Sequence, residues 1–418
     1  MASLVVEGGH PLSGVVEVEG NKNAALPMLA ACLLTSEECV LENAPRIRDV
    51  EAMCRLLQGL GAEVEGVGTS TLRVRCRELR TVDPDPALVA RIRGSVLLVA
   101  PLLARAGRAG VGEPGGDFPG RRSIATHRRA LAALGAVAEA ADGRALVAPG
   151  GLRGASFYLR EASVTATETA LLGAATAPGR SEIRNAAGEP HVADLARFLR
   201  RMGAEVSGEG TSTLRVDGVP SLHGAKHRID GDSIEAGTWA VAAAVTGGAV
   251  EVRGARALDV EPIVAGLSAF GVRCEVEEGR LRVLESTLEA AGRVTTGLWP
   301  GFPTDMVSLV TVLATQARGS TLVHDWLYEL RLFALEQLSG MGADLFLCDP
   351  HRIVVTGPRR LRGRALDSRD IRSGMALVAA ALAAEGASRI EPLETIERGY
   401  ARVAERLRGL GAVVEREA

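Results

Sequence analysis

The chain has 418 residues and a net charge of −3, and 47% of its residues are hydrophobic while only 3% are aromatic. Its length fits two domains better than one, and its balanced charge does not favour a basic face for nucleic acid. The longest apolar stretch, residues 95–104, is too short to span a membrane, and the N-terminus lacks the pattern of a signal sequence. We therefore expect a cytoplasmic globular protein of enzyme size, with neither nucleic acid nor membrane as a partner.

A signature of small residues ends an apolar helical pattern six times along the chain. Its glycines are Gly61, Gly135, Gly203, Gly271, Gly342 and Gly411. Successive glycines are about 70 residues apart, which predicts six copies of one supersecondary repeat.

Each repeat reads as a helix followed by strands. In the first repeat the apolar residues between 50 and 60 fall on one helix face, and the glycine after them is a candidate C-terminal cap. Asp49 and Asp194 occupy candidate N-cap positions in the first and third repeats. The segment GTSTLRV, at residues 68–74 and again at 210–216, predicts a turn and a strand.

A second recurring feature, a turn followed by an apolar helix, lies about 40 residues before each signature glycine. Unusual polar residues collect there: Lys22 with Asn23, Arg93, Ser163 to Thr165, Asp232 with Glu235, Asp305, and Asp370 with Arg372. A solenoid would place these clusters along a stripe, whereas two closed groups of three repeats would turn six helix N-termini inward, where they favour bound anions. We prefer the closed form, an α/β fold of two three-repeat domains, because the length fits two domains.

The domain boundaries are predicted from the phase of the repeats. Residues 220–230 form the natural crossover between the third and fourth repeats, and Gly20 and Gly231 occupy matching phases. We therefore expect one domain at residues 21–229 and a second built from residues 1–20 and 230–418, joined by two linkers.

The cysteines, histidines and lysines of the chain bear on which kinds of site it can hold. The six cysteines show no CxxC pairing, so we expect reduced core thiols rather than a metal site or a disulfide framework. The seven histidines show no HExxH or comparable ligand spacing. Of 48 basic residues only Lys22 and Lys226 are lysines. Lys22 is thus a candidate for a site that needs a compact ammonium, the alternative being a turn lysine exposed to water.

The glycine- and proline-rich segment at residues 113–123 carries ionisable groups. It is a candidate lid that brings Asp117 and Arg122 to a ligand, since its glycines can absorb large backbone changes. The alternative is a solvated surface loop. Neither GxGxxG after a strand nor GxxxxGK[ST] occurs in the chain.

Motifs along essentially the whole chain resemble the enolpyruvyltransferases. They are GNKNAALP at Gly20, RGS at Arg93, PGGD at Pro114, SVTAT at Ser163, NAAGEP at Asn185, FPTDM at Phe302, ELR at Glu329, SRDIRSG at Ser368 and ERGY at Glu397. The resemblance implies two inverse α/β barrels of three repeats each, which bind phosphoenolpyruvate and a nucleotide sugar without metal. It also implies a monomer or weak oligomer.

The reaction implied by the resemblance is transfer of the enolpyruvyl group of phosphoenolpyruvate to a hydroxyl of UDP-N-acetylglucosamine, with release of phosphate, in peptidoglycan precursor synthesis. The implied catalytic residues are Asp117 as general acid, Asp305 as general base, and Lys22. Residues implied to bind phosphoenolpyruvate are Lys22, Asn23, Arg122, Arg331, Asp370, Arg372 and Arg398. Residues implied to bind the acceptor are Asn23, Arg93, Arg122, Ser123, Ile124, Ala125, Thr126, Glu161, Ala162, Ser163, Val164, Asp305 and Leu327.

Some roles have alternatives. Asp305 is also a candidate N-cap of a helix at residues 306–317. Asp370 is expected to orient arginines as well as to lie near phosphoenolpyruvate. Asp117 stands where most of the family carries the cysteine that fosfomycin alkylates, so we expect resistance to that antibiotic.

The acceptor side departs further from the family pattern. An aspartate usual two residues after Ser123 is replaced by Ala125, a lysine usual before the diphosphate-binding serine by Glu161, and arginines usual at two other places by Gly188 and Ser233. These departures favour a second hypothesis, a relative that acts on another nucleotide or nucleotide sugar in natural-product biosynthesis. A third hypothesis is a catalytically silent repeat protein that binds anions.

Overall fold

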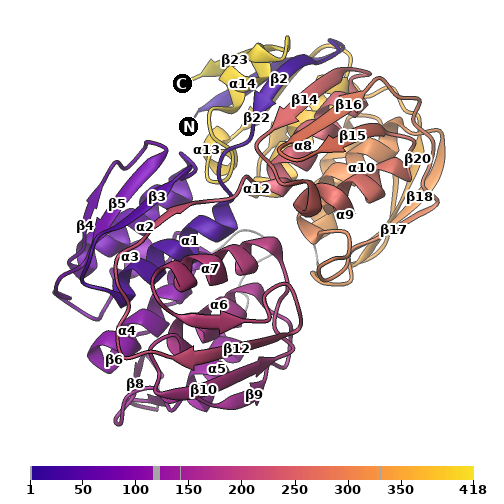
Figure 1. The fold of residues 1–418 in the computed structure, drawn as a ribbon. Coiled ribbons are helices and arrows are strands. Elements are labelled where there is room, and N and C mark those ends of the chain that lie inside the picture. Colours follow the sequence, from indigo (N-terminus) through magenta and orange to yellow (C-terminus); the bar gives the residue numbers. More distant parts are fainter. Residues whose placement is uncertain (1, 116–122, 142, 330) are drawn as a thin grey trace. The chain divides into compact units, whose positions relative to one another are not determined.

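The computed structural model describes residues 2–115, 123–141, 143–329 and 331–418. They form two compact units (Figure 1): a central unit of residues 20–115 and 123–230, and a terminal unit of residues 2–19 and 231–418. Within the described ranges, the chain passes from one unit to the other after Glu19 and after Asp230.

The central unit contains seven α-helices and two 3₁₀ helices in its described part. They are α1 (Lys22–Ala31), η1 (Cys32–Leu34), α2 (Arg48–Leu60), α3 (Pro86–Val89), η2 (Arg93–Leu98), α4 (Val99–Ala106), α5 (Ala125–Ala133), α6 (Val164–Ala174) and α7 (Pro190–Arg201). Its strands are β3 (Cys39–Glu42), β4 (Glu63–Glu65), β5 (Thr71–Arg75), β6 (Arg108–Gly110), β7 (Val137–Ala138), β8 (Ala145–Val147), β9 (Ser156–Tyr158), β10 (Gly179–Arg184), β11 (Glu205–Ser207), β12 (Thr213–Gly218) and β13 (Lys226–Arg228).

The terminal unit has a similar mixture of elements. Its helices are α8 (Ser233–Val245), α9 (Ala257–Ser268), η3 (Thr304–Met306), α10 (Val307–Gln316), η4 (Arg331–Glu336), α11 (Gln337–Gly340), α12 (Ile371–Ala383), α13 (Leu393–Ile396) and α14 (Val403–Gly409). Its strands are β1 (Ser3–Glu7), β2 (Ser13–Glu17), β14 (Ala249–Arg253), β15 (Arg273–Glu277), β16 (Arg280–Leu284), β17 (Arg293–Thr295), β18 (Gly319–His324), β19 (Asp344–Asp349), β20 (Arg352–Gly357), β21 (Ala365–Asp367), β22 (Ala387–Glu391) and β23 (Val413–Glu417).

Five of the sheets share one strand order, in which an outer strand runs parallel to its neighbour and two antiparallel strands follow. In the central unit these sheets are β13-β3-β5-β4 and β9-β10-β12-β11, beside the three-stranded β6-β8-β7. In the terminal unit they are β2-β14-β16-β15, β17-β18-β20-β19 and β21-β22-β1-β23. The last sheet joins both ends of the chain, because β1 pairs with β22 on one side and β23 on the other.

The core of the terminal unit is a group of three helices, α8, α10 and α12, which contact one another. Their residues are buried on nearly every face; α8, for example, is buried from Glu235 to Val245. A helix that is apolar all round must be enclosed, and in Figure 1 sheets β14–β16 and β18–β20 lie outside α8 and α10. The structure confirms the predicted mixed α/β class.

The six signature glycines end helices or their last turns as predicted. All six have positive φ, from 79° at Gly271 to 111° at Gly61, a conformation that glycine adopts without a steric penalty. At Gly61 a Cβ atom would also lie 2.9 Å from backbone atoms of Arg80 and Glu78. The GTSTLRV segments form the predicted turns before β5 and β12.

The two predicted aspartate N-caps are wrong. Helix α2 begins at Arg48, so Asp49 lies in its first turn, and α7 begins at Pro190, so Asp194 lies inside it. Proline suits the first helical position, where no backbone N–H donor is required. Both aspartates are instead buried and pair with other side chains, Asp49 with Lys22 and Asp194 with His227.

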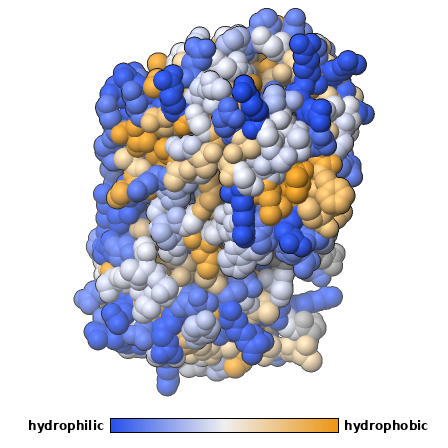
Figure 2. Space-filling view, turned by 90° about the vertical axis from the view of Figure 1, so that its right-hand side faces the viewer, coloured by the Kyte–Doolittle hydropathy of each residue, from blue (hydrophilic) through white to orange (hydrophobic). Residues whose placement is uncertain are grey.

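The surface view in Figure 2 shows hydrophilic and hydrophobic residues interspersed over one face. Among the described residues, no helix combines the length and the apolar character that a membrane span requires. The same part of the chain contains no group of three or more histidine, cysteine or acidic side chains placed to hold a metal ion. All six cysteines are free, and four of them are buried.

Candidate active site

Asp305 lies at the centre of a polar cluster in the terminal unit. It belongs to η3, at the start of the buried helix α10. Its Oδ1 atom accepts a hydrogen bond of 3.0 Å from Arg331, at the start of η4. Its Oδ2 atom accepts two bonds from Arg372, of 3.1 Å from Nε and 2.8 Å from Nη2. The alternative that Asp305 caps a helix is wrong, since no side-chain cap is present there.

The charges of this cluster are tightly coupled. Both arginine side chains are only 10% exposed, whereas that of Asp305 is 25% exposed. Burial opposes ionisation of Asp305, but Arg372 and Arg331 outweigh it and hold the pKa of the carboxyl far below its ordinary value. The Asp305 carboxylate faces two guanidinium groups, and guanidinium groups can also bind an anionic ligand.

The N-terminus of α12 is built around Asp370. Its Oδ1 atom accepts hydrogen bonds of 2.9 Å from the backbone N–H groups of Arg372 and Ser373, and Oδ2 accepts one from the Ser373 hydroxyl. Asp370 is therefore the N-cap of the helix that carries Arg372. Asp370 therefore positions Arg372 through the backbone N–H group of that arginine.

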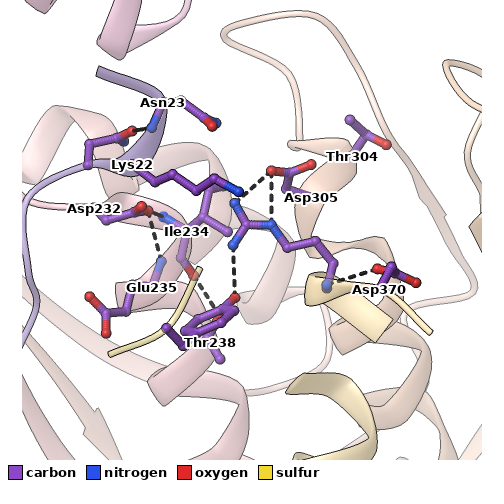
Figure 3. A network of polar contacts seen from close by, with 12 residues as sticks. Lys22, Asn23, Asp232, Ile234, Glu235, Thr238, Thr304, Asp305 and Asp370 are labelled. Carbon is purple, nitrogen blue, oxygen red and sulfur yellow. Dashed lines mark hydrogen bonds and ion pairs between the residues drawn. The ribbon is translucent and has the colours of Figure 1, made fainter. Parts of the chain in front are cut away.

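Thr304 continues the network on the other side of Asp305, and Figure 3 shows both residues. Its hydroxyl accepts from Arg331 at 2.9 Å and donates to the fully buried Asp325 at 2.7 Å. Asp325 also accepts the backbone N–H of Leu327 at 3.2 Å. The predicted acceptor residue Leu327 is thus held next to the Asp305 cluster through Asp325.

A second buried ion pair lies at the start of α8. Asp232 caps this helix, and Glu235 pairs with Arg406 of α14. Glu235 also accepts the backbone N–H of Glu19 at 2.8 Å, and the Arg406 guanidinium lies 4.8 Å from the ring centroid of Trp239. The sequence singled out Asp232 and Glu235 but gave them no role. Figure 3 shows the Asp232 side chain accepting the backbone N–H groups of Ile234 and Glu235 at the start of α8.

In the central unit, Lys22 is the first residue of α1 and pairs with Asp49 of α2 at 2.7 Å. Its side chain is only 13% exposed, so the alternative of a water-exposed turn lysine is wrong. Asn21 caps the same helix by accepting the backbone N–H groups of Asn23 and Ala24. The cap and the ion pair together hold Lys22 and Asn23 at the positive end of the α1 dipole.

Three groups of predicted acceptor residues in the central unit lie at helix starts. Arg93, at the start of η2, donates a hydrogen bond of 3.0 Å to the backbone carbonyl of Ser123. The Ser123 hydroxyl accepts the backbone N–H of Ala125, at the start of α5. Ser163 caps α6, which contacts both η2 and α5. The structure therefore brings these three parts of the sequence together.

A buried histidine joins α5 and α6. His127 Nε2 lies 2.8 Å from the Thr165 hydroxyl, linking α5 to α6. Burial, with a smaller effect of Arg93, lowers the pKa of His127 to about 3, so the imidazole is neutral at pH 7. The sequence analysis missed His127, and a lone histidine on an amphipathic helix gave no signal that would have found it.

The remaining predicted residues are placed as follows. Ile124 and Thr126 flank Ala125 at the start of α5, Glu161 and Ala162 precede the Ser163 cap, and Val164 is the first residue of α6. Arg398 follows α13 in the terminal unit. Asp117 and Arg122 lie outside the described residues.

Solved structures identify the class of fold. The chain superposes on the enolpyruvyl transferase NikO from Streptomyces tendae with a TM-score of 0.87 and 24% identity, covering 99% of this chain and 98% of that one. It matches EPSP synthase from Acinetobacter baumannii with a TM-score of 0.76 and 18% identity, covering 100% of both chains. The fold is therefore that of the enolpyruvyl transferases.

Sequence comparison then gives the family. The model of the EPSP synthase family (3-phosphoshikimate 1-carboxyvinyltransferase) matches residues 6–407, and the chain belongs to this family of enolpyruvyl (1-carboxyvinyl) transferases. Relatives named UDP-N-acetylglucosamine 1-carboxyvinyltransferase include one from Bradyrhizobium diazoefficiens, 45% identical over 99% of this chain and 97% of its own. Another, from Treponema pallidum, is 41% identical over the full length of both chains. The predicted resemblance is confirmed.

Proposed function

We propose that this protein transfers the enolpyruvyl group of phosphoenolpyruvate to a hydroxyl of UDP-N-acetylglucosamine, by addition and then elimination of phosphate, in peptidoglycan precursor synthesis. The observation that carries the proposal is Asp305, held between Arg331 and Arg372. In this arrangement the carboxylate can accept the proton of the attacking hydroxyl. The two neighbouring guanidinium groups can bind the anionic groups of phosphoenolpyruvate. The full-length relatives named for this reaction support the choice of acceptor.

Asp305 is the general base in this proposal, and its Oδ1 atom takes the proton. A carboxylate oxygen has two lone pairs; Oδ2 accepts two bonds from Arg372, whereas Oδ1 accepts one from Arg331. The remaining lone pair of Oδ1 can accept the hydroxyl of the acceptor. Although the pKa of Asp305 is low, the negative charges of bound phosphoenolpyruvate raise it and make the carboxylate a stronger base during the addition.

Arg331, Arg372 and Arg398 bind the phosphate and carboxylate groups of phosphoenolpyruvate in the terminal unit. Guanidinium groups suit this task because their planar donor sets match such oxyanions. Asp370 contributes by capping α12 and fixing the backbone of Arg372.

In the central unit, Lys22, Asn23 and Arg122 bind phosphoenolpyruvate, and Asp117 donates the proton to its C3 atom. The nucleotide sugar contacts Arg93, residues 122–126 and residues 161–164, around the starts of α5 and α6. The addition and elimination leave every oxidation state unchanged and need no cofactor. Because nucleotide sugars are made in the cytoplasm, we place the reaction there, in a monomer or weak oligomer.

A specific observation favours a second candidate, transfer to a different nucleotide or nucleotide sugar. Ala125 starts α5 where the family usually supplies a carboxylate, and Glu161 precedes the Ser163 cap where a lysine is usual. Both changes alter the charge offered to the acceptor.

The test is a phosphate-release assay with phosphoenolpyruvate and a panel of UDP-sugars and free nucleotides. Activity with UDP-N-acetylglucosamine is the expected result. Activity with another acceptor alone would replace the first proposal by the second. A protein that binds phosphoenolpyruvate but releases no phosphate with any acceptor would be the catalytically silent anion-binding protein instead.

A further inference from the structure

Tyr400 is a fully buried side chain that contacts the Asp305 cluster through Arg372. Its hydroxyl lies 3.0 Å from Arg372 Nη1 and 2.9 Å from the hydroxyl of Thr238 in α8. The Arg372 guanidinium also lies 5.5 Å from the Tyr400 ring centroid. Tyr400 therefore holds the side of Arg372 that faces away from Asp305.

The donors and acceptors of this contact fix the direction of each hydrogen bond. Thr238 has one hydroxyl proton, which it donates to the backbone carbonyl of Ile234 at 2.7 Å. Tyr400 must then donate its own proton to Thr238. The Tyr400 oxygen is left as an acceptor, which suits the N–H group of Arg372, a group that can only donate. In Figure 3, Ile234 and Thr238 lie at one end of this series of hydrogen bonds and Asp305 lies at the other.

All three donor nitrogens of Arg372 are thereby used at once. Nε and Nη2 bond to Asp305, and Nη1 bonds to Tyr400. A guanidinium group held at both edges cannot turn about its own axis, so the plane that it presents to Asp305 is fixed. Losing the Tyr400 oxygen would leave a buried N–H group unsatisfied and would free this rotation.

We propose that Tyr400 is a positioning residue for enolpyruvyl transfer, which acts by holding Arg372 in the orientation that serves Asp305 and phosphoenolpyruvate. This inference rests on the proposed function for its catalytic consequence. The orientation of Arg372 itself is measurable without any substrate.

The first test measures hydrogen exchange of the Arg372 Nε–H group by nuclear magnetic resonance, with the signal assigned from its loss in Arg372→Lys. In the unsubstituted protein this group should exchange far more slowly than that of Arg360, whose side chain is 89% exposed. Equal exchange would overturn the proposal without any variant. In Tyr400→Phe the exchange of Arg372 should rise by about tenfold or more.

Thr238→Val is the matched variant, because it removes a hydroxyl from the same chain but leaves the Tyr400 oxygen available to Arg372. Its Arg372 exchange should rise less than in Tyr400→Phe, even if both variants unfold at similarly lowered temperatures. Equal exchange in the two variants would show that Tyr400 only supports the packing of α8, and would overturn the proposal.

The second test is a double-mutant cycle on kcat/KM for phosphoenolpyruvate. Tyr400→Phe should lower kcat/KM by about tenfold in the otherwise unchanged enzyme and have little further effect in an Arg372→Lys background. Equal losses in both backgrounds would contradict action through Arg372. If the unsubstituted protein has no transferase activity with any acceptor, the proposed function fails, whereas the exchange measurement still decides the role of Tyr400.

Discussion

Asp305 Oδ2 lies 2.8 Å from Arg372 Nη2, although 67 residues separate them in the sequence. The carboxylate that we propose as the base is therefore held by a cation that we propose to bind phosphoenolpyruvate. The basicity of Asp305 and the binding of an anion by Arg372 are therefore coupled. An anion bound to Arg372 raises the proton affinity of Asp305, and a proton on Asp305 strengthens anion binding by Arg372.

Replacing Asp305 separates proton acceptance, which needs its carboxylate, from anion binding, which needs the neighbouring arginines. In Asp305→Asn, kcat should fall by about 10²- to 10⁴-fold because the proton acceptor is lost. Anion binding should be kept or strengthened, since the variant removes the negative charge that pairs with Arg331 and Arg372. We expect phosphate to raise the melting temperature of the variant more than that of the unsubstituted protein. The control is Asp344→Asn, which removes one partner of the exposed Arg359 ion pair. Normal turnover in Asp305→Asn would exclude Asp305 as the general base.

The variant Lys22→Arg tests whether the site needs the compact ammonium group of a lysine. The Nζ atom of Lys22 lies 2.7 Å from the buried Asp49, in a place only 13% exposed, and the larger arginine side chain must shift to fit it. We expect Lys22→Arg to lower kcat/KM by about 100-fold, as a displacement near the reacting groups can do. The only other lysine provides the matched control, because Lys226 is 66% exposed and pairs with Glu42. A Lys22→Arg enzyme as active as Lys226→Arg would disprove this requirement.

The aspartate at position 117 predicts resistance to fosfomycin. A carboxylate is a much poorer nucleophile than a thiolate towards the epoxide, so the unsubstituted enzyme should show no time-dependent inactivation. Asp117→Cys should become sensitive and gain one covalent adduct, which mass spectrometry would locate. The exposed Cys348 serves as an internal control for unspecific alkylation. Inactivation of the unsubstituted enzyme, with the adduct at residues 113–123, would refute the prediction.

Glu168 should make stability depend on pH. This residue of α6 is 1% exposed, and burial, with a smaller effect of Glu189, raises its pKa well above 4.5. Between the ordinary pKa and the raised one, the folded protein binds more protons than the unfolded chain, so the free energy of unfolding falls as pH rises. The contribution is complete below about pH 4.5 and is lost as pH rises through the folded-state pKa.

Glu168→Gln should remove this dependence, because the amide stays neutral. Urea unfolding at about pH 5 and about pH 8 should show the variant gaining stability over the unsubstituted protein at the higher pH, by at most about 1.4 kcal/mol per unit of pH. Glu405→Gln, at a side chain that is 65% exposed, is the control. A constant difference between Glu168→Gln and the unsubstituted protein at both pH values would show that Glu168 is ionised when folded.

The sequence by itself determined the local structure and the family. Glycine is the residue that accepts positive φ without a steric penalty, so Gly61 and its five counterparts mark the helix ends in the sequence itself. Polar residues before apolar helices marked the helix starts at Ser163, Asp232 and Asp370, all of which are N-caps in the structure. Motifs with fixed neighbours identified the enolpyruvyltransferases, and the family match agrees.

Only the tertiary structure decided which side chains meet. Asp49 and Asp194 fitted an N-cap pattern, but their carboxylates pair with buried side chains from other elements, Lys22 and His227. Likewise, the contact of Tyr400 with Arg372 depends on how the segment after α13 packs against α12. A local pattern records the hydrogen bonds that a segment makes with itself, whereas partners distant in sequence are set by the packing of whole helices and sheets.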